Sequence, residues 1–360
     1  MVQDTVGGRG LIGFAISRYG WPAGRMKPTI AIATGDPAGI GPEISLKAAL
    51  DPAVRSVCHP VVVSDPAVLA RHARACGIKA ELRVVERAGD ARSSARRINV
   101  LACPQPEAAK LGFGSTSAAS GRASLAFASG AIKAALAGQV DAVVAAPQNE
   151  TSIALAGIPF DGYPSFVARE TGADAGSVYL MLCFGDTRIV HCTLHASVRE
   201  ALGMITRARV GDAIRAADRA LKQLGVRSPR ICVGGLNPHA GESGLFGREE
   251  AEVIAPAIAD AAAAGVRVEG PYGADTMFHR KGVDAFVVML HDQGHIAAKL
   301  LAPNAAAAMT IGAPVLFSSV AHGSASDMAG RNRASPAAMI EAVRRVAASR
   351  KSNVASRKGA

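Results

Sequence analysis

The stretch that decides the fold is Thr29-Ile-Ala-Ile-Ala-Thr-Gly-Asp-Pro-Ala-Gly-Ile-Gly-Pro-Glu43. Its first five residues predict a buried strand, and a glycine-rich turn follows them. Pro42 suits the first turn of a helix, so a helix is expected over residues 43–50. A loop of this kind either cradles an anion at the helix N-terminus or simply makes a tight strand-to-helix turn. It matches neither the dinucleotide-binding glycine pattern nor the Walker A pattern, so nucleotide binding does not follow from it.

The rest of the chain repeats this strand-then-helix order. The expected strands are residues 61–63, 141–146, 178–184, 188–193, 230–234 and 285–290, with extended segments at 304–312 and 315–319, and the expected helices are one ending near 75 and those at 118–137, 166–170, 210–224, 248–264 and 336–348. The two central strands flank Gly185-Asp186, which indicates a hairpin. Alternating strands and helices predict an α/β fold with a mixed, largely parallel sheet.

Composition narrows the function classes. The length of 360 residues suggests about two domains. The net charge of +11 is not concentrated in a stripe of Lys and Arg among aromatic residues, so no nucleic-acid partner is expected, although a positive field suits a small anionic substrate. No apolar run is long enough to cross a membrane, so we do not expect the protein to bind a membrane. The six cysteines are scattered without metal-knuckle spacing, which favours a reducing, cytoplasmic location.

Three histidines follow three different predicted strands. His195 comes after the strand at 188–193, His239 after that at 230–234, and His291 after that at 285–290. Ligands of open α/β sheets bind at the carboxyl ends of strands, so three imidazoles placed there could hold one divalent metal with an open position. The alternative is that each is an ordinary hydrogen-bonded histidine. His191 lies inside a strand pattern and is expected in the core or on a sheet face.

Acid–base groups and a polar loop accompany these histidines. Asp275 and Asp292 are placed to orient ligands, and Lys299 is a candidate acid or base, since a lysine near a metal has a lowered pKa. A solvated surface lysine is the alternative. The loop His322-Gly-Ser-Ala-Ser-Asp-Met-Ala-Gly330 is rich in small residues, which would let a flat ligand approach the backbone, or would simply lead into the last helix.

Seven short segments of the chain, in this order, resemble the PdxA family of NAD-dependent, metal-dependent dehydrogenases. They are Gly35 to Glu43, Ala156 to Phe160, Thr193 to His195, Gly235 to Glu242, Gly273 to Thr276, His291 to Gly294 and His322 to Gly330. The resemblance implies NAD, a metal on His195, His239 and His291, and catalytic roles for Asp275, Asp292 and Lys299. Zinc is the first expectation for the metal, with cobalt, manganese, nickel and magnesium as alternatives. The implied cofactor contacts are Gly35, Asp36, His322, Gly323, Ser324, Ala325, Asp327 and Gly330.

The resemblance also implies an architecture. The expected fold has two domains and is similar to isocitrate and isopropylmalate dehydrogenases. The first, cofactor-side domain comprises residues 27–150 and 316–350, and the second, carrying the metal, substrate and dimer contacts, comprises 151–315. Residues 1–26 are expected to be an extension that is disordered or mis-called, and 351–360 a tail. A homodimer with its active site at the subunit interface is implied.

The departures from the family pattern concern the substrate. The vitamin-B6 members have Gly-His-Thr where this chain has Gly162-Tyr163-Pro164, and a substrate-binding Asn and Arg align with Ala308 and Phe317. Loss of these donors argues against a phosphate ester. Gly162 to Ser165, Leu290 to His295 and Lys299 to Asn304 instead resemble terephthalate dihydrodiol dehydrogenases.

That subgroup implies oxidation of 1,2-dihydroxy-3,5-cyclohexadiene-1,4-dicarboxylate to protocatechuate, CO2 and NADH. The expected substrate contacts are Tyr163, Pro164, Ala308, Phe317 and Lys299, with the aromatic rings as apolar walls. The alternatives are a dehydrogenase of 4-hydroxythreonine-4-phosphate or another small hydroxy acid and, from a different class, a non-catalytic ligand-binding paralogue.

Overall fold

The computed structural model describes residues 27–302 and 306–348, so the expected extension at 1–26, the tail at 351–360 and residues 304–305 lie outside the described chain. Twelve strands in the described part form one sheet. They are β1 (Thr29–Ala33), β2 (His59–Ser64), β3 (Glu81–Val85), β4 (Arg97–Ala102), β5 (Ala142–Ala145), β6 (Tyr179–Phe184), β7 (Thr187–His191), β8 (Arg230–Gly234), β9 (Arg267–Tyr272), β10 (Ala285–Val288), β11 (Ala307–Ile311) and β12 (Phe317–Val320).

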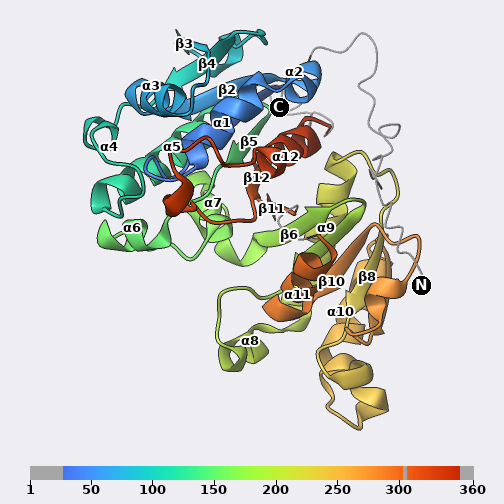
Figure 1. Cartoon of the computed structure of the whole chain (residues 1–360). Helices are drawn as coiled ribbons and strands as arrows, with labels where there is room; N and C mark the ends of the chain where they lie inside the picture. The colour runs from blue at the N-terminus through green and yellow to red at the C-terminus, as the bar shows by residue number, and fades with distance from the viewer. Residues whose placement is uncertain (1–26, 303–305, 349–360) are drawn as a thin grey trace, which may run out of the picture.

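The helices fall between these strands (Figure 1). The α-helices are α1 (Gly41–Leu50), α2 (Pro52–Val57), α3 (Pro66–Ala75), α4 (Pro106–Ala109), α5 (Ala118–Leu136), α6 (Glu150–Leu155), α7 (Tyr163–Thr171), α8 (Val198–Met204), α9 (Arg207–Gln223), α10 (Ala255–Ala263), α11 (His291–Leu301) and α12 (Ala337–Ala347). The short turns that matter below are η4 (Pro238–Gly244), the π-helical η5 (Glu250–Ile254) and η7 (Ser326–Met328).

The sheet is mixed and largely parallel, as the alternating pattern predicts. The strand order is β3-β4-β2-β1-β5-β12-β11-β6-β7-β10-β8-β9. Only the three central pairs, β12 with β11, β11 with β6 and β6 with β7, are antiparallel among the described strands. The predicted central hairpin is confirmed, because Phe184 pairs with Thr187 across Gly185-Asp186.

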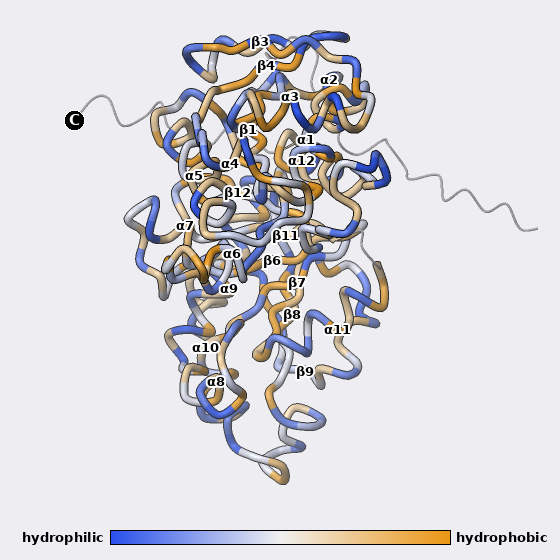
Figure 2. The backbone as a smooth tube through the Cα atoms, turned by 60° about the vertical axis from the view of Figure 1, so that its left-hand side comes forward, coloured by the Kyte–Doolittle hydropathy of each residue, from blue (hydrophilic) through white to orange (hydrophobic). Residues whose placement is uncertain are grey.

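Helices cover both faces of the sheet, and β1 shows why (Figures 1 and 2). Ile30 and Ile32 point to the face packed by α1, α12, α9 and α10. Ala31 and Ala33 point to the opposite face, where α5 packs. Neighbouring residues of a strand face opposite sides, so a strand that is apolar throughout must be buried between two helical layers. On the far half of the sheet, Ala298 of α11 packs into a third apolar cluster.

Several elements were missed by pattern, among them β4, the short helices α2, α4, α6 and α8, and the three discussed next. Strands β3 and β9 lie at the two edges of the sheet and carry charged residues or Gly-Pro, so they lack the apolar run of a buried strand. Helix α11 begins with His-Asp-Gln-Gly-His, which is weakly helical and shows no clear apolar period. Its formation depends on packing one side against the sheet. This matters because α11 places Lys299 two turns beyond His291.

Candidate active site

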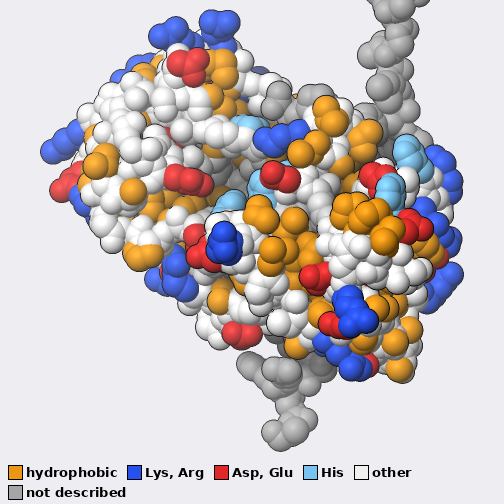
Figure 3. Space-filling model, turned by 90° about the horizontal axis from the view of Figure 1, so that it is seen from below, with side chains coloured by type: hydrophobic (Ala, Val, Ile, Leu, Met, Phe, Trp, Pro, Cys, Tyr) orange, Lys and Arg blue, Asp and Glu red, His pale blue; other side chains and the backbone are white. Residues whose placement is uncertain are grey.

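A cavity of about 660 Å³ brings together residues that are far apart in the sequence. Its wall includes His195, Lys299 and the apolar Leu180 and Leu182. The predicted site residues that line it are Gly323, His322, Ala308, Lys299, His195, Pro164 and Tyr163. Seen from below, the surface is hollowed and histidine side chains gather along the hollow (Figure 3).

Within the described ranges, no helix is long and apolar enough to cross a membrane.

Two of the three predicted metal ligands face one another. The ring centroids of His195 and His291 are 5.9 Å apart. Nδ1 of His195 donates to the Asp161 carbonyl oxygen at 2.5 Å, since a carbonyl only accepts. Nδ1 of His291 is 2.7 Å from Oδ1 of Asp292. Both contacts engage Nδ1 and leave Nε2 free of these partners, and Nε2 is the atom that a metal ligand of this orientation would use. Asp292 thus contacts the ring of one of the three candidate ligands.

His239 lies on a separate loop. It begins a run of left-handed residues in η4, with φ angles of 52° at His239 and 54° at Ala240. Such angles cost free energy for residues with a Cβ, so the loop must be held by its surroundings. Across residues 27–302 and 306–348, no group of three or more His, Cys, Asp or Glu side chains is arranged to hold a metal. One chain thus supplies His195 and His291 together, without His239 beside them.

Glu250 holds the His239 loop, and sequence reasoning missed it. This buried carboxylate accepts hydrogen bonds from the backbone N–H groups of Leu236 and Asn237, both at 2.7 Å, and from Nδ2 of Asn237 at 2.9 Å. Asp275 lies on the neighbouring turn and is exposed. A Cβ built on Gly273 would be 2.7 Å from Oδ1 of Asp275 and 3.6 Å from Cα of His239, so those two residues share one loop cluster. Neither residue lines the cavity described above.

Helix α11 carries a second histidine, His295, which the sequence did not single out as a candidate. His291, His295 and Lys299 are spaced four residues apart and share one side of the helix. The His295 ring stacks on His291 with centroids 3.8 Å apart and lines the cavity beside Lys299. Burial, aided by the charge of His291, lowers the pKa of His295 to about 4. The four-residue spacing of His291, His295 and Lys299 was the signal in the sequence that could have indicated His295.

His191 is a core residue, as the strand pattern predicts. It is 1% exposed, and its ring centroid lies 4.6 Å from that of His295. Neither ring nitrogen has a hydrogen-bond partner, although the nearby Leu180 backbone favours the protonated ring. Burial outweighs this contact and lowers the pKa of His191 to about 3. His191 is therefore a neutral packing surface for α11.

Tyr163 forms one wall of the cavity. Its hydroxyl donates to the Ala146 carbonyl oxygen at 2.9 Å and accepts from Nε2 of Gln148 at 2.6 Å. Burial raises the pKa of Tyr163, so the phenol is neutral. Phe317 was expected on the same wall, and the structure corrects this. Phe317 is fully buried in β12 and packs behind Tyr163 with ring centroids 4.9 Å apart, so it supports that ring instead of touching a ligand.

The two loops predicted to contact the cofactor lie side by side. The Ile40 N–H donates to the Ser324 carbonyl oxygen at 2.9 Å, and a Cβ on Gly39 would be 2.8 Å from Cβ of Ser324. Asp36 is buried: its Oδ1 accepts from the Ala38 N–H and the Ser120 hydroxyl, and its Oδ2 has no hydrogen-bond partner. Gly323 lines the cavity with open space where a Cβ would be.

These features fit a flat ligand. Exposed backbone at Gly323 and a small-residue turn, with Ala325 at φ 40°, allow close approach. The partnerless Asp36 oxygen offers an acceptor close to the same pair of loops. Ser324 is buried and half-buried Gly330 packs against the Phe113 ring, whereas Asp327 is exposed. Some of the candidate cofactor residues are therefore buried and support the loops, and others are exposed and could contact a ligand.

Comparison with known proteins assigns the chain to a family. The family model "Pyridoxal phosphate biosynthetic protein PdxA" matches residues 56–346, and the chain belongs to the PdxA family. A 1,2-dihydroxy-3,5-cyclohexadiene-1,4-dicarboxylate dehydrogenase from Comamonas sp is 41% identical over 87% of this chain and 95% of that protein. A putative D-threonate 4-phosphate dehydrogenase from Symbiobacterium thermophilum is 39% identical over 88% and 95%.

Solved structures agree with this placement. A 4-hydroxythreonine-4-phosphate dehydrogenase from Klebsiella pneumoniae has a TM-score of 0.81 at 36% identity, covering 89% of this chain and 100% of that one. A terephthalate 1,2-cis-dihydrodiol dehydrogenase from Burkholderia xenovorans LB400 has a TM-score of 0.66 at 44% identity, covering 90% and 98%. The chain is therefore an oxidoreductase of the dehydrogenase class, and its family implies a nicotinamide cofactor and a divalent metal.

Proposed function

We propose that this enzyme oxidises and decarboxylates a cyclic cis-dihydrodiol dicarboxylate, converting terephthalate dihydrodiol to protocatechuate, CO2 and NADH. The observation that carries the proposal is the cavity wall. Tyr163, Pro164 and Ala308 supply apolar surface next to His195 and Lys299. A flat unsaturated ring fits apolar walls. The named relative from Comamonas sp acts on this dicarboxylate.

The residues of the chain divide the chemistry among them. Lys299, exposed in the cavity, would take the proton of the substrate hydroxyl while hydride leaves the same carbon for NAD. The product is a β-keto acid, whose C–C bond to the carboxylate breaks to release CO2. The bonding electrons pass into the ring, which becomes the aromatic phenolate and then takes a proton. Aromatisation makes the overall step strongly downhill.

A divalent metal would be held by His195, His239 and His291, and when bound it supplies positive charge that lowers the alcohol pKa and stabilises oxyanions. Asp292 fixes the His291 ring, and Asp275 would orient a ligand or substrate hydroxyl. Zinc is the proposed metal because three imidazoles suit it, with cobalt, manganese, nickel and magnesium as alternatives.

A homodimer is part of this proposal. One chain does not gather His239 with the other two histidines within its described residues, so a second copy would complete the site. Large apolar side chains are exposed on α11, where Ile296 is 58% and Leu300 77% exposed, and on α8, where Val198 is 66% exposed. Such surface is typical of an interface between subunits.

The division into domains and the location also remain proposals. A boundary between residues 27–150 with 316–350 and residues 151–315 would fall between β12 and β11, within the continuous sheet. The first unit would carry the cofactor loops and the second the metal and substrate groups. We propose that the reaction takes place in the cytoplasm as a step of aromatic catabolism.

The test is NADH formation, followed by absorbance, with NAD, added zinc, cobalt, manganese or magnesium, and one of two substrates. Turnover of the terephthalate cis-dihydrodiol, with protocatechuate identified by chromatography, is the expected result. Turnover of 4-hydroxythreonine-4-phosphate alone would overturn the substrate assignment and the role given to Tyr163. Metal binding without turnover of any substrate would favour the non-catalytic paralogue.

A second substrate class has one observation in its favour. A putative D-threonate 4-phosphate dehydrogenase matches 88% of the chain at 39% identity, almost as well as the Comamonas sp relative. A small phosphorylated hydroxy acid would place its phosphate near Lys299, the only lysine or arginine among the described residues that line the cavity. D-threonate 4-phosphate therefore belongs in the same assay, together with 4-hydroxythreonine-4-phosphate.

A further inference from the structure

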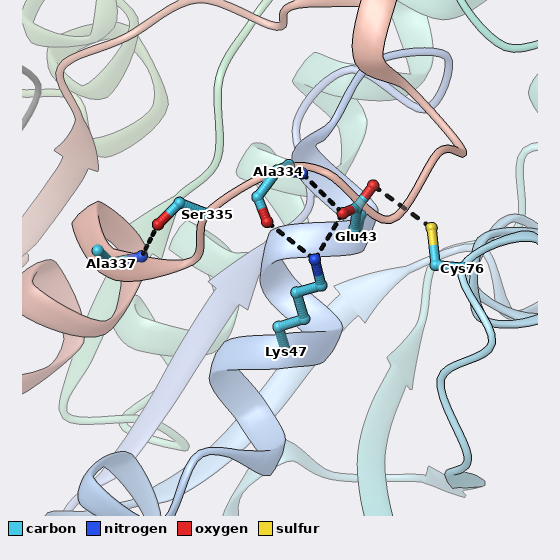
Figure 4. Close-up of polar contacts among 6 residues, drawn as sticks. All are labelled: Glu43, Lys47, Cys76, Ala334, Ser335 and Ala337. Atoms are coloured by element: carbon cyan, nitrogen blue, oxygen red, sulfur yellow. Dashed lines mark hydrogen bonds and ion pairs between the residues drawn. The ribbon is translucent and has the colours of Figure 1, made fainter.

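A buried carboxylate in α1 is not used by the proposed chemistry. The Glu43 side chain is 0% exposed and accepts three hydrogen bonds. Its donors are Nζ of Lys47 at 2.7 Å, the backbone N–H of Ala334 at 3.0 Å, and Sγ of Cys76 at 3.3 Å (Figure 4). Glu43 thereby joins α1, the end of α3 and the segment that leads into α12.

Lys47 completes the arrangement one turn further along α1. Its Nζ donates to the Ala334 carbonyl oxygen at 2.8 Å while it pairs with Glu43. Both backbone polar groups of Ala334 are therefore held by one ion pair on α1 (Figure 4). The next residue, Ser335, accepts from the Ala337 N–H at 3.3 Å and so fixes the start of α12.

The held segment is the continuation of the loop that the proposed function assigns to the cofactor. Residues 322–330 run directly into Ala334, and the start of that loop is fixed to the N-cap of the same helix through Ile40 and Ser324. The loop is therefore attached to α1 at two points. The first is beside the glycine turn that precedes the helix, and the second is at Glu43 and Lys47.

Fold stability alone is a weak reason for this ion pair. Burying the Glu43 carboxylate, and partly burying the Lys47 ammonium, costs desolvation that an apolar pair of similar volume would avoid, so such a pair is poor evidence of net stabilisation. An apolar pair, however, could not hold an N–H and a C=O group at one defined position. The geometry is suited to setting where a backbone segment lies.

We propose that Glu43 is a positioning residue for nicotinamide nucleotide binding: with Lys47 it fixes residues 322–335 against α1, so that Gly323 and its neighbours are already placed when the cofactor arrives. This inference rests on the proposed function, because it takes the 322–330 loop as the cofactor loop. Pre-organisation of a loop improves affinity by removing the cost of ordering it during binding.

The variant that tests this is Glu43→Gln, with Asp218→Asn as its matched control. Asp218 and Lys222 form the same kind of ion pair, four residues apart at 2.7 Å, but on α9, away from the loop. Three readouts apply: the dissociation constant of NADH by fluorescence titration, hydrogen exchange of segment 322–335, and KM for NAD against KM for the carbon substrate.

The expected result is that Glu43→Gln weakens NADH binding by about fivefold or more, a typical size for coupling between two sites. Exchange in 322–335 should quicken, while KM for the carbon substrate and the bound metal stay as in the parent protein. Asp218→Asn should leave NADH affinity unchanged. If Glu43→Gln does not fold, Lys47→Met, at a partly exposed residue, replaces it with the same expectations.

Unchanged NADH affinity in a folded Glu43→Gln or Lys47→Met variant would overturn the positioning role. So would an equal loss in Asp218→Asn, because it would show a general effect of destabilisation. Failure of the parent protein itself to bind any nicotinamide nucleotide would overturn the proposed function, and this outcome is visible before any variant is compared.

Discussion

Gly294 of α11 lies so close to His191 of β7 that a Cβ at position 294 would overlap Nε2 of the His191 ring. The helix that carries His291, His295 and Lys299 is therefore seated directly on the sheet through one glycine and one buried imidazole. Any side chain at this position would lift the first turns of α11 off the sheet.

Gly294→Ala should therefore disturb the site as well as the fold. The methyl group meets a rigid buried ring, and overpacking of this kind costs about 1–3 kcal/mol of unfolding free energy. Bound metal should fall too, because His291 moves with the helix. Denaturant unfolding and metal analysis measure the two effects. Gly203→Ala in α8 is the control, since a Cβ there meets nothing within 4 Å. Equal effects in both variants would contradict this interpretation.

Glu250→Gln should loosen the loop that presents His239. The amide cannot accept a hydrogen bond at both ends, so the contact between Oε2 and the Asn237 side chain is lost, at about 1.5–3 kcal/mol for a bond to a charged group. We expect lower metal affinity in a titration with zinc. Glu249→Gln is the matched control, because its exposed carboxylate contacts the same Asn237 side chain. Normal zinc affinity in Glu250→Gln would show that the loop is held by other contacts.

His295→Leu tests a residue that lines the cavity without being an expected metal ligand. Its Nδ1 donates to the His291 carbonyl oxygen at 3.2 Å, which leaves Nε2 as an acceptor for a substrate hydroxyl. Loss of that acceptor should lower kcat/KM by about tenfold, near one hydrogen bond, with metal content unchanged. His295→Gln keeps an acceptor and should recover part of the loss. A fall in bound metal for His295→Leu would instead assign it to holding His291.

Tyr163→Phe removes the hydroxyl but keeps the ring. The Ala146 carbonyl oxygen and the Gln148 amide each lose a partner, so the unfolding free energy should fall by about 1–3 kcal/mol. Substrate KM should change little, because the ring supplies the wall. Tyr163→Ala should raise KM as well, since it also removes the surface supported by Phe317. Similar KM values for the two variants would remove Tyr163 from the substrate wall.

His72 predicts how stability depends on pH. Its ring is fully buried in α3, with Nε2 2.9 Å from the Pro37 carbonyl oxygen, and burial lowers its pKa from 6.5 to about 4. As pH falls below 6.5, the unfolded chain binds a proton that the folded chain resists. The contribution of neutral His72 to the unfolding free energy is therefore fully present above pH 6.5 and is lost progressively as the pH falls to about 4.

The full loss from His72 should be about 3 kcal/mol, at about 1.4 kcal/mol for each pKa unit. Urea unfolding at several pH values, compared between the parent protein and His72→Gln, measures it. The variant should show a shallower decline between pH 6.5 and 4. Parallel curves for the two proteins would mean that other groups account for the acid sensitivity.

Much of the scaffold was predictable because its signals are local. The apolar run of β1, the glycine turn after it and the two residues between β6 and β7 each specify their own backbone. The α11 helix and the edge strands β3 and β9 were not predictable in this way. Their sequences carry weak periodicity, and packing against the sheet supplies what local propensity lacks.

The same distinction between local signals and tertiary packing applies to the residues of the candidate site. The sequence by itself determined which residue types stand at strand ends, and hence His195, His239, His291 and Lys299 as candidates. Only the tertiary structure showed that His195 and His291 face each other, that Phe317 lies behind Tyr163, and that Glu43 holds Ala334 from far along the chain. The physical reason is that local hydrogen bonding and side-chain periodicity act within a few residues. Contacts between distant segments depend on strand order and on how helices pack across the sheet, which no short stretch encodes.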